Sequence, residues 1–105
     1  MTREDAKNMF GKGFHKLIDR LYDRLKPEQI ESIKSKYGRI DLYINGTEEE
    51  QDFGYEIERE SEKTCENCGK PGELKSINGW ITALCDKCYK RYKKKYENKT
   101  ISRKH

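Results

Sequence analysis

Two cysteine pairs are the residues of this chain whose type and spacing point most directly to chemistry. Cys65 and Cys68 form one C-x2-C pair, Cys85 and Cys88 form another, and sixteen residues separate the two pairs. This spacing lets both sulfurs of each pair reach one ion at about 2.3 Å, with a hairpin between the pairs to return the chain to the metal. The pattern therefore predicts one structural zinc ion bound by four thiolates, with no open position for catalysis.

The same cysteines also fit two redox-active pairs, a disulfide scaffold or an iron–sulfur cluster. Redox pairs seldom fall at metal-ligand spacing, which disfavours the first alternative. The sequence contains no apolar run of signal-peptide or membrane-spanning length, so we expect a cytoplasmic protein with no membrane partner. Disulfides are rare in that reducing compartment, and zinc is the preferred assignment.

The elements that must position these cysteines begin with helices. Thr2 resembles a helix cap, and Gly11 and Gly13 interrupt the helix after it, because glycine disfavours a helix interior. Apolar residues three and four apart predict a firmer helix over 14–25. A proline that suits a first helical position and a glycine that suits a helix end predict a second helix over 27–37.

Strand signals and an acidic segment come after this helical part. Period-two alternation predicts a strand over 39–44, and Asn45-Gly46 then supplies a turn. We expect an acidic loop over 47–52 and a short helix over 55–63, immediately before the first cysteine pair.

The segment between and after the cysteine pairs predicts a hairpin followed by a helix. The runs 74–77 and 80–84 flank Asn78-Gly79, which is typical of a tight β-hairpin. The run 89–97 contains no glycine or proline and is helix-prone. A helix start at the second cysteine pair stabilises thiolates through its free N–H groups.

These elements together predict an α+β protein whose core needs support from a metal. Only 32% of the residues are hydrophobic, which is little for a chain of 105 residues. Knuckle, hairpin and helix in this order are typical of a treble-clef-like zinc finger, with a zinc ribbon as the alternative if the last segment is not helical. We predict a helical and strand lobe over 1–63, packed on a four-cysteine zinc finger over 64–97, and a basic flexible tail over 98–105.

Three segments of the chain carry a resemblance to known proteins. They are the run 33–43, the run 58–72 around the first cysteine pair, and the run 79–88 around the second, preceded by Gly13-Phe14 at a helix start. The sequence resembles a family of small proteins from phages, prophages and their bacterial hosts, over roughly 13–89. The resemblance implies a phage or mobile-element accessory protein that acts on host machinery, including the nucleases of defence systems, in the host cytoplasm. It also supports zinc, and it implies no enzymatic activity.

Basic side chains gather in the last helix that we predict. The candidates for binding nucleic acid or a partner are Lys87, Lys90, Arg91, Lys93, Lys94 and Lys95. Such density predicts salt-sensitive binding of DNA or RNA without sequence preference, and a solvated face is the alternative. Tyr89, Tyr92 and Tyr96 share a helix face, where we expect them to cover Trp80 and the hairpin; stacking on bases is the other interpretation.

A second charged segment has the opposite sign. Its candidates for partner binding are Glu48, Glu49, Glu50 and Asp52. The acidic stretch, which continues through Glu56, Glu58, Glu60 and Glu62, has three interpretations: a solvated surface, pairing with the basic helix of the same chain, or imitation of a nucleic-acid backbone in the basic groove of a partner. The spacing of these carboxylates does not match a calcium loop.

The sequence predicts a binding protein and not an enzyme. Residues 69–104 contain no histidine, which a treble-clef nuclease needs for catalysis. We expect a non-catalytic, zinc-binding interaction protein of phage or mobile-element type, without a small-molecule substrate. Its expected partner is a host protein or nucleoprotein complex, with inhibition of a host defence nuclease as one outcome. The alternative is direct, weakly specific binding of DNA or RNA through the basic helix.

Overall fold

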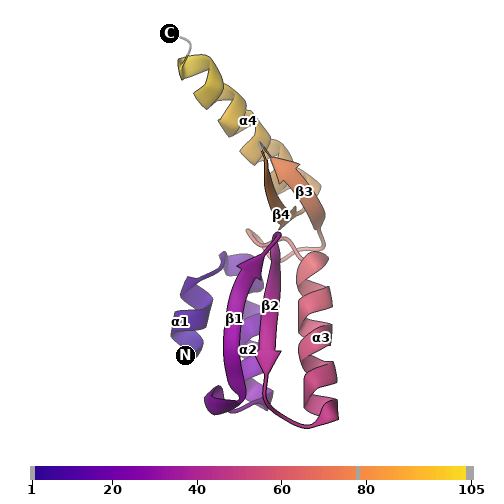
Figure 1. Ribbon diagram of the computed structural model, residues 1–105. Helices are drawn as coiled ribbons and strands as arrows, with labels where there is room; N and C mark the ends of the chain where they lie inside the picture. Colours follow the sequence, from indigo (N-terminus) through magenta and orange to yellow (C-terminus); the bar gives the residue numbers. More distant parts are fainter. Residues whose placement is uncertain (1, 78, 104–105) are drawn as a thin grey trace.

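The chain combines helices with two small antiparallel sheets in the computed structural model (Figure 1). The structure describes the backbone of residues 2–77 and 79–103, and the side chains of residues 2–77 and 79–95. The helices are α1 (Arg3–Asn8), α2 (His15–Arg24), α3 (Glu48–Glu62) and α4 (Asp86–Arg103). The strands are β1 (Ile30–Lys36), β2 (Arg39–Ile44), β3 (Glu73–Ile77) and β4 (Trp80–Leu84). The predicted mixture of α and β elements is thereby confirmed.

The two N-terminal helices agree with their sequence signals. Thr2 caps α1, because its Oγ1 accepts a hydrogen bond of 3.1 Å from the backbone N–H of Asp5. Helix α2 lies within the predicted range 14–25, after a short 3-10 turn (η1, Lys12–Phe14). Its apolar stripe is buried and consists of Leu17, Ile18, Leu21 and Tyr22.

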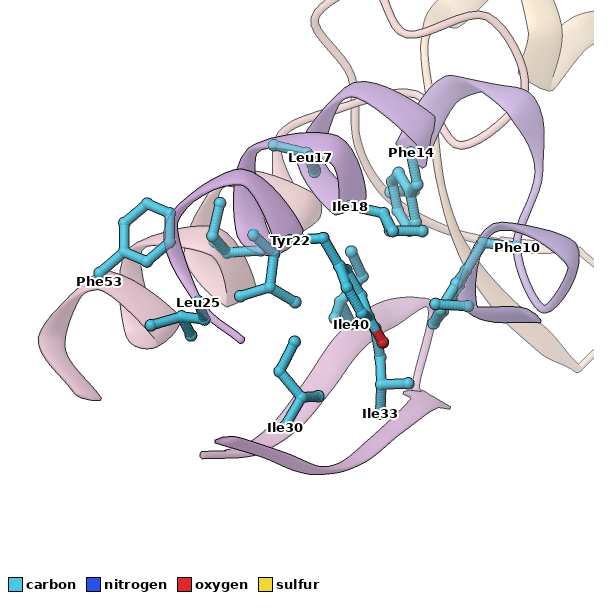
Figure 2. Packing of buried hydrophobic residues seen from close by; sticks show 14 residues of the cluster. Phe10, Phe14, Leu17, Ile18, Tyr22, Leu25, Ile30, Ile33, Ile40 and Phe53 are labelled. Atoms are coloured by element: carbon cyan, nitrogen blue, oxygen red, sulfur yellow. The ribbon is translucent and has the colours of Figure 1, made fainter. Parts of the chain in front are cut away.

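This stripe packs on one face of the sheet β1–β2 to form the main core (Figure 2). Ile30, Ile33 and Ile40 line the sheet side of the core. Phe10 and Phe14 close the end nearer the hairpin β3–β4. Helix α3 packs beside β2 and adds its own apolar side chains, so α2, α3 and the sheet enclose one core.

The helix predicted over 27–37 is wrong, because most of this segment is strand β1. A 3-10 turn (η2, Pro27–Gln29) leads into the strand, and Tyr37 and Gly38, with φ of 51° and 79°, form the hairpin turn. A β-bulge between Ile30 and Ser32 sets two residues of β1 against one of β2. The extra residue reverses the alternation, so Ile30 and Ile33 both face the core. A bulged strand thus imitated the three-residue spacing of a helix.

Strand β2 confirms the strand predicted over 39–44, but the acidic loop predicted over 47–52 is wrong. These residues form the first turn of α3 and its cap. Thr47 and Glu50 make a capping box: Thr47 Oγ1 accepts from the Glu50 N–H at 3.2 Å, and Glu50 Oε1 accepts from the Thr47 N–H at 2.9 Å. The Thr47 N–H and the Gln29 side chain lower the pKa of Glu50. The carboxylates of this turn also suit the positive end of the helix dipole.

Helix α3 closes the outer edge of the sheet with polar side chains. The backbone N–H of Ile40 donates to Ser61 Oγ at 3.0 Å, and that of Leu42 donates to Glu58 Oε2 at 2.7 Å. Ser61 is fully buried and donates its own proton to the Glu58 carbonyl at 2.5 Å. The edge of a two-stranded sheet would otherwise offer unpaired N–H groups to other chains.

Replacing this buried hydroxyl is expected to destabilise the fold. In Ser61→Ala the Ile40 N–H loses its acceptor in a buried place, which costs about 1–3 kcal/mol. Urea unfolding of the two proteins measures the free energy of unfolding. Ser35→Ala, at an exposed position of β1 opposite Ile40, is the matched control and should change stability by less than about 0.5 kcal/mol. Equal losses in the two variants would contradict the role of Ser61.

The C-terminal part contains the predicted hairpin and helix. Strands β3 and β4 pair in register from Glu73 opposite Leu84 to Ile77 opposite Trp80. Gly79 has a φ of 87°, as a tight turn requires, whereas Asn78 of the predicted turn lies outside the described residues. Helix α4 begins three residues before the predicted range and continues to Arg103, so it includes the backbone of much of the expected tail.

Candidate metal centre

The four cysteines meet where the hairpin β3–β4 joins α4. Cys65 and Cys68 lie in the loop after α3, Cys85 follows β4, and Cys88 is in the first turn of α4. One ligand atom from each residue lies within 4.8 Å of the other three. The predicted cluster is therefore present, and its arrangement can hold a metal ion.

Backbone hydrogen bonds shape both cysteine turns. In the first, the Gly69 N–H donates to the Cys65 carbonyl and the Cys65 N–H donates to the Lys70 carbonyl, each at 2.8 Å. Gly69 reverses the chain with a φ of 83°, a conformation that favours glycine. In the second turn, the Cys88 N–H points at Cys85 Sγ at 3.4 Å, because free N–H groups surround the start of α4.

The four sulfurs, all within 4.8 Å of one another, lie close enough to share a single ion. Metal–sulfur bonds of about 2.3 Å in a tetrahedron place the sulfurs about 3.8 Å apart, and Cys68 Sγ lies 3.7 Å from Cys85 Sγ. A disulfide needs about 2.05 Å, and all four cysteines are free. A four-iron cluster binds each thiolate to a different iron, which requires wider spacing than four sulfurs around one ion.

The ionisation of the thiols also fits a bound cation. Burial raises the pKa of Cys65, but the backbone N–H groups of Cys85, Cys68 and Asn67 outweigh it and lower the pKa to about 7. The Asn67 side chain lowers the pKa of Cys88, yet burial and the three neighbouring cysteines raise it to about 11. The Cys65 thiol thus loses its proton readily, whereas burial and the neighbouring cysteines disfavour deprotonation of Cys88. A divalent cation relieves this repulsion and deprotonates all four ligands.

A polar chain outside the cluster orients one ligand. Asn67 Nδ2 donates to Cys88 Sγ at 3.3 Å, and the Tyr92 hydroxyl donates to Asn67 Oδ1 at 3.2 Å. Such partners fix the position of a ligand and adjust its basicity. The role of Asn67 was not predicted from the sequence. The pattern that could have indicated it is an amide side chain between Cys65 and Cys68 together with a tyrosine one helical turn after Cys88.

Two glycines attach this centre to the N-terminal helices, which is a role that sequence reasoning missed. The Gly13 N–H donates to the Glu66 carbonyl at 2.7 Å, and the Gly11 N–H donates to Glu66 Oε2 at 3.0 Å. A Cβ at Gly13 would lie 1.9 Å from the Cys65 carbonyl oxygen. Ala83 of β4 adds a further contact between the two parts of the chain, since its side chain belongs to the main core under α2. The glycines therefore break the helix and also permit close contact with the first cysteine turn.

The basic candidate residues lie along one projecting helix. The side chains of Lys87, Lys90, Arg91, Lys93, Lys94 and Lys95 are all exposed. Helix α4 contacts the hairpin and then continues away from the rest of the molecule (Figure 1). The side chains of the segment 98–105, which was predicted to be a basic tail, lie outside the described residues. The structure thus places six cations on one helix next to the metal centre.

The acidic candidate residues lie at the other end of the molecule. Glu48, Glu49 and Asp52 are exposed at the start of α3, whereas Glu50 is half-buried in the capping box. This end lies far from α4 (Figure 1), so one of the three interpretations, pairing with the basic helix of the same chain, is wrong for these four acids. The acidic and the basic candidate residues therefore lie in different parts of the molecule.

The aromatic residues of α4 pack as expected only in part. Tyr89 and Tyr92 are half-buried against the small core beside the cysteines, so they cover the hairpin. Trp80, which they were expected to cover, is 72% exposed. The side chain of Tyr96 lies outside the described residues.

The fold and the site together define a small chain of helices and antiparallel hairpins with a four-cysteine cluster suited to one metal ion. Comparisons with known protein families, with curated proteins and with solved structures give no match. Among the residues that the structure describes, no helix combines the length and the apolar character needed to cross a membrane.

Proposed function

We propose that the cluster binds one structural Zn²⁺ and that this part of the chain is a treble-clef-like zinc finger. Four thiolates around one ion are a typical structural zinc site. A cysteine turn, the hairpin β3–β4 and a helix that begins at the second pair support the treble clef over the ribbon. Zinc here holds the start of α4 against the hairpin and does no chemistry, because four protein ligands occupy every position of a tetrahedral ion.

We further propose that the protein binds nucleic acid through α4 without catalysing a reaction. The observation that supports this function best is the projection of six exposed cations on one helix anchored at the metal centre. The sequence alone favoured a host protein over direct nucleic-acid binding. We place nucleic-acid binding first, because α4 stands clear of the body and its cations lie far from the acidic end of the molecule (Figure 1).

Binding is expected to be strongly salt-dependent. If α4 neutralises four phosphates of a single strand, raising the salt from about 50 to about 200 mM weakens binding about fifty-fold. Fluorescence anisotropy of zinc-loaded protein with labelled single-stranded and double-stranded DNA and RNA measures this slope. Changing Lys90, Arg91, Lys94 and Lys95 to Gln is expected to flatten the slope and remove most of the binding.

A matched control separates the place of the charges from their number. Changing Lys16, Lys26, Lys34 and Lys36 to Gln removes the same charge from exposed positions of the N-terminal part. This variant should bind nearly as well as the unchanged protein. Equal losses in the two variants would show that net charge, and not α4, attracts nucleic acid.

A protein partner is the second candidate, and the acidic start of α3 favours it. Glu48, Glu49 and Asp52 form an exposed acidic group that no part of the described chain neutralises. Carboxylates on a rigid helix turn suit a basic groove, such as the nucleic-acid groove of a host defence nuclease that a phage protein would inhibit. Such a complex would depend on these three acids and would survive the loss of the α4 cations.

A further inference from the structure

A cavity of about 260 Å³ opens between the hairpin β3–β4 and α4, beside the metal centre. Trp80 and Tyr92 contribute aromatic walls, Ile77 and Leu84 contribute an apolar floor, and Glu66 supplies a carboxylate. Leu84 and Ile77 are 2% and 7% exposed, so the floor is part of the folded core. Tyr92 is held in place by its hydrogen bond to Asn67. The floor of the cavity and one of its aromatic walls are therefore held by packing and hydrogen bonding within this part of the chain.

Trp80 is the unusual wall of this cavity. It is 72% exposed in a chain that has few large apolar residues and uses most of them in its cores. Its partner across the hairpin, Ile77, is buried, so the strand pair itself does not force the indole into solvent. Exposed tryptophan next to a formed cavity is a feature of surfaces that stack flat ligands.

The charges around the cavity indicate what kind of flat ligand it accepts. On a helix, residues three apart are neighbours, so Lys95 adjoins Tyr92 of the cavity wall. Lys95 is exposed, and so is Arg91, which precedes Tyr92 in α4. An anionic polymer with flat units therefore meets aromatic walls and cations together, whereas a cationic peptide would be repelled by α4. We propose that this cavity binds an unpaired base of a single-stranded nucleic acid, stacked on Trp80 beside Tyr92, with the adjoining phosphates on α4.

Glu66 gives the cavity a means to select among bases. Its carboxylate accepts from the Gly11 N–H at 3.0 Å and lies 3.4 Å from Thr82 Oγ1. A carboxylate has about four acceptor sites, so capacity remains for a ligand. Guanine offers two adjacent donors, N1–H and the N2 amino group, whereas thymine offers one N–H between two carbonyls. The proposed base is therefore guanine in preference to thymine.

The inference rests on the proposed nucleic-acid function, and the experiment tests the two separately. The single tryptophan of the chain is itself the probe, because a base stacked on it quenches its fluorescence. Three oligomers of about ten nucleotides are compared: all-thymine DNA, the same DNA with one central guanine, and an abasic strand with the same phosphates. We expect quenching by both base-bearing strands at lower concentration for the guanine strand, and none by the abasic strand.

Trp80→Ala is expected to weaken binding of the guanine strand about tenfold in anisotropy, which is typical of losing one stacked base. Ile81→Ala is the matched control, since Ile81 is the next residue, is 43% exposed and does not line the cavity; its binding should not change. Circular dichroism checks that both variants fold.

Each contrary outcome overturns a defined part of the inference. Equal binding of abasic and base-bearing strands, without quenching, overturns the base site and leaves binding through α4 intact. No binding of any strand at low salt overturns both. A lysine-rich peptide that quenches Trp80 at lower concentration than the oligomers would make the cavity a site for cationic peptides. Equal affinity for the guanine and thymine strands would overturn the role of Glu66.

Discussion

Removing the metal is expected to unfold the part of the chain from Cys65 to the first turns of α4. Structural zinc sites of this kind contribute roughly 10–16 kcal/mol in isolated fingers, more than most whole domains have as net stability. The small core of this part consists of two cysteines with Ile77 and Leu84, so without the ion little apolar contact remains. Any thiolate that forms in the cluster without the ion also lacks the cation that offsets its repulsion with the neighbouring sulfurs.

Hydrogen exchange with and without a chelator measures this effect. Amides of the hairpin β3–β4 and the start of α4 should exchange at nearly unprotected rates after chelation. Amides of α2 should retain more protection, because the core under α2 holds most of the large buried side chains. Native mass spectrometry of the untreated protein should show one zinc ion per chain.

Two further measurements complete the zinc experiment: substitution of one cysteine, and the return of zinc to the chelated protein. Cys65→Ser removes the fully buried ligand and should give the chelated pattern even with zinc present. Adding zinc back to the chelated, unchanged protein should restore protection, whereas adding magnesium should not, since magnesium prefers oxygen ligands. Protection that survives chelation would show that the cysteines stabilise the fold without a metal.

Gly13→Ala is expected to cause the largest loss of stability among single changes outside the cysteines. The new Cβ would meet the Cys65 carbonyl oxygen at 1.9 Å and the Glu66 carbonyl carbon at 2.6 Å. Both are backbone atoms, so the η1 turn and the first cysteine turn must separate, and the hydrogen bond from the Gly13 N–H to Glu66 is lost. We expect a cost of about 3 kcal/mol, at the upper end for overpacking.

Thermal and urea unfolding of zinc-loaded Gly13→Ala measure this cost. Gly79→Ala is the matched control: its φ of 87° makes alanine unfavourable by roughly 1–2 kcal/mol, but nothing lies within 4 Å of the new Cβ. Gly13→Ala should also weaken zinc binding, because the turn that carries Cys65 moves, whereas Gly79→Ala should not. Equal losses of stability in the two variants, with unchanged zinc affinity, would show that the contact between Gly13 and the first cysteine turn can adjust to a Cβ.

Some of the errors in the sequence-based prediction arose from signals that were present but misread. Thr47 followed three residues later by Glu50 is the pattern of a capping box, and it marks the true start of α3. The acidic composition of this segment suggested a loop, although carboxylates are favoured in the first turn of a helix. The error over 27–37 was harder to avoid. Ile30 and Ile33 lie three residues apart, which suits a helix, and nothing in the sequence alone marks the β-bulge that turns both side chains to one face of β1.

The sequence by itself determined those features whose cause is local. The spacing of the cysteines, the apolar stripe of α2, the hairpin around Gly79 and the helix after Cys85 each depend on residues near one another in the chain. Local backbone geometry and side-chain periodicity are sufficient to specify them. For the same reason the clustering of the four cysteines was predicted correctly.

Only the tertiary structure decided the features that depend on distant partners. Position 13 must be a glycine, without a side chain, because the backbone of Cys65, fifty-two residues further along the chain, lies in contact with it. A buried serine is favourable at position 61 because its hydroxyl accepts a hydrogen bond from the backbone N–H of Ile40 in β2. Trp80 lines an open cavity because Glu66, Leu84 and Tyr92, from three separate segments, come together beside it. Such contacts arise from packing between elements, and packing is set by the whole chain and not by any one segment.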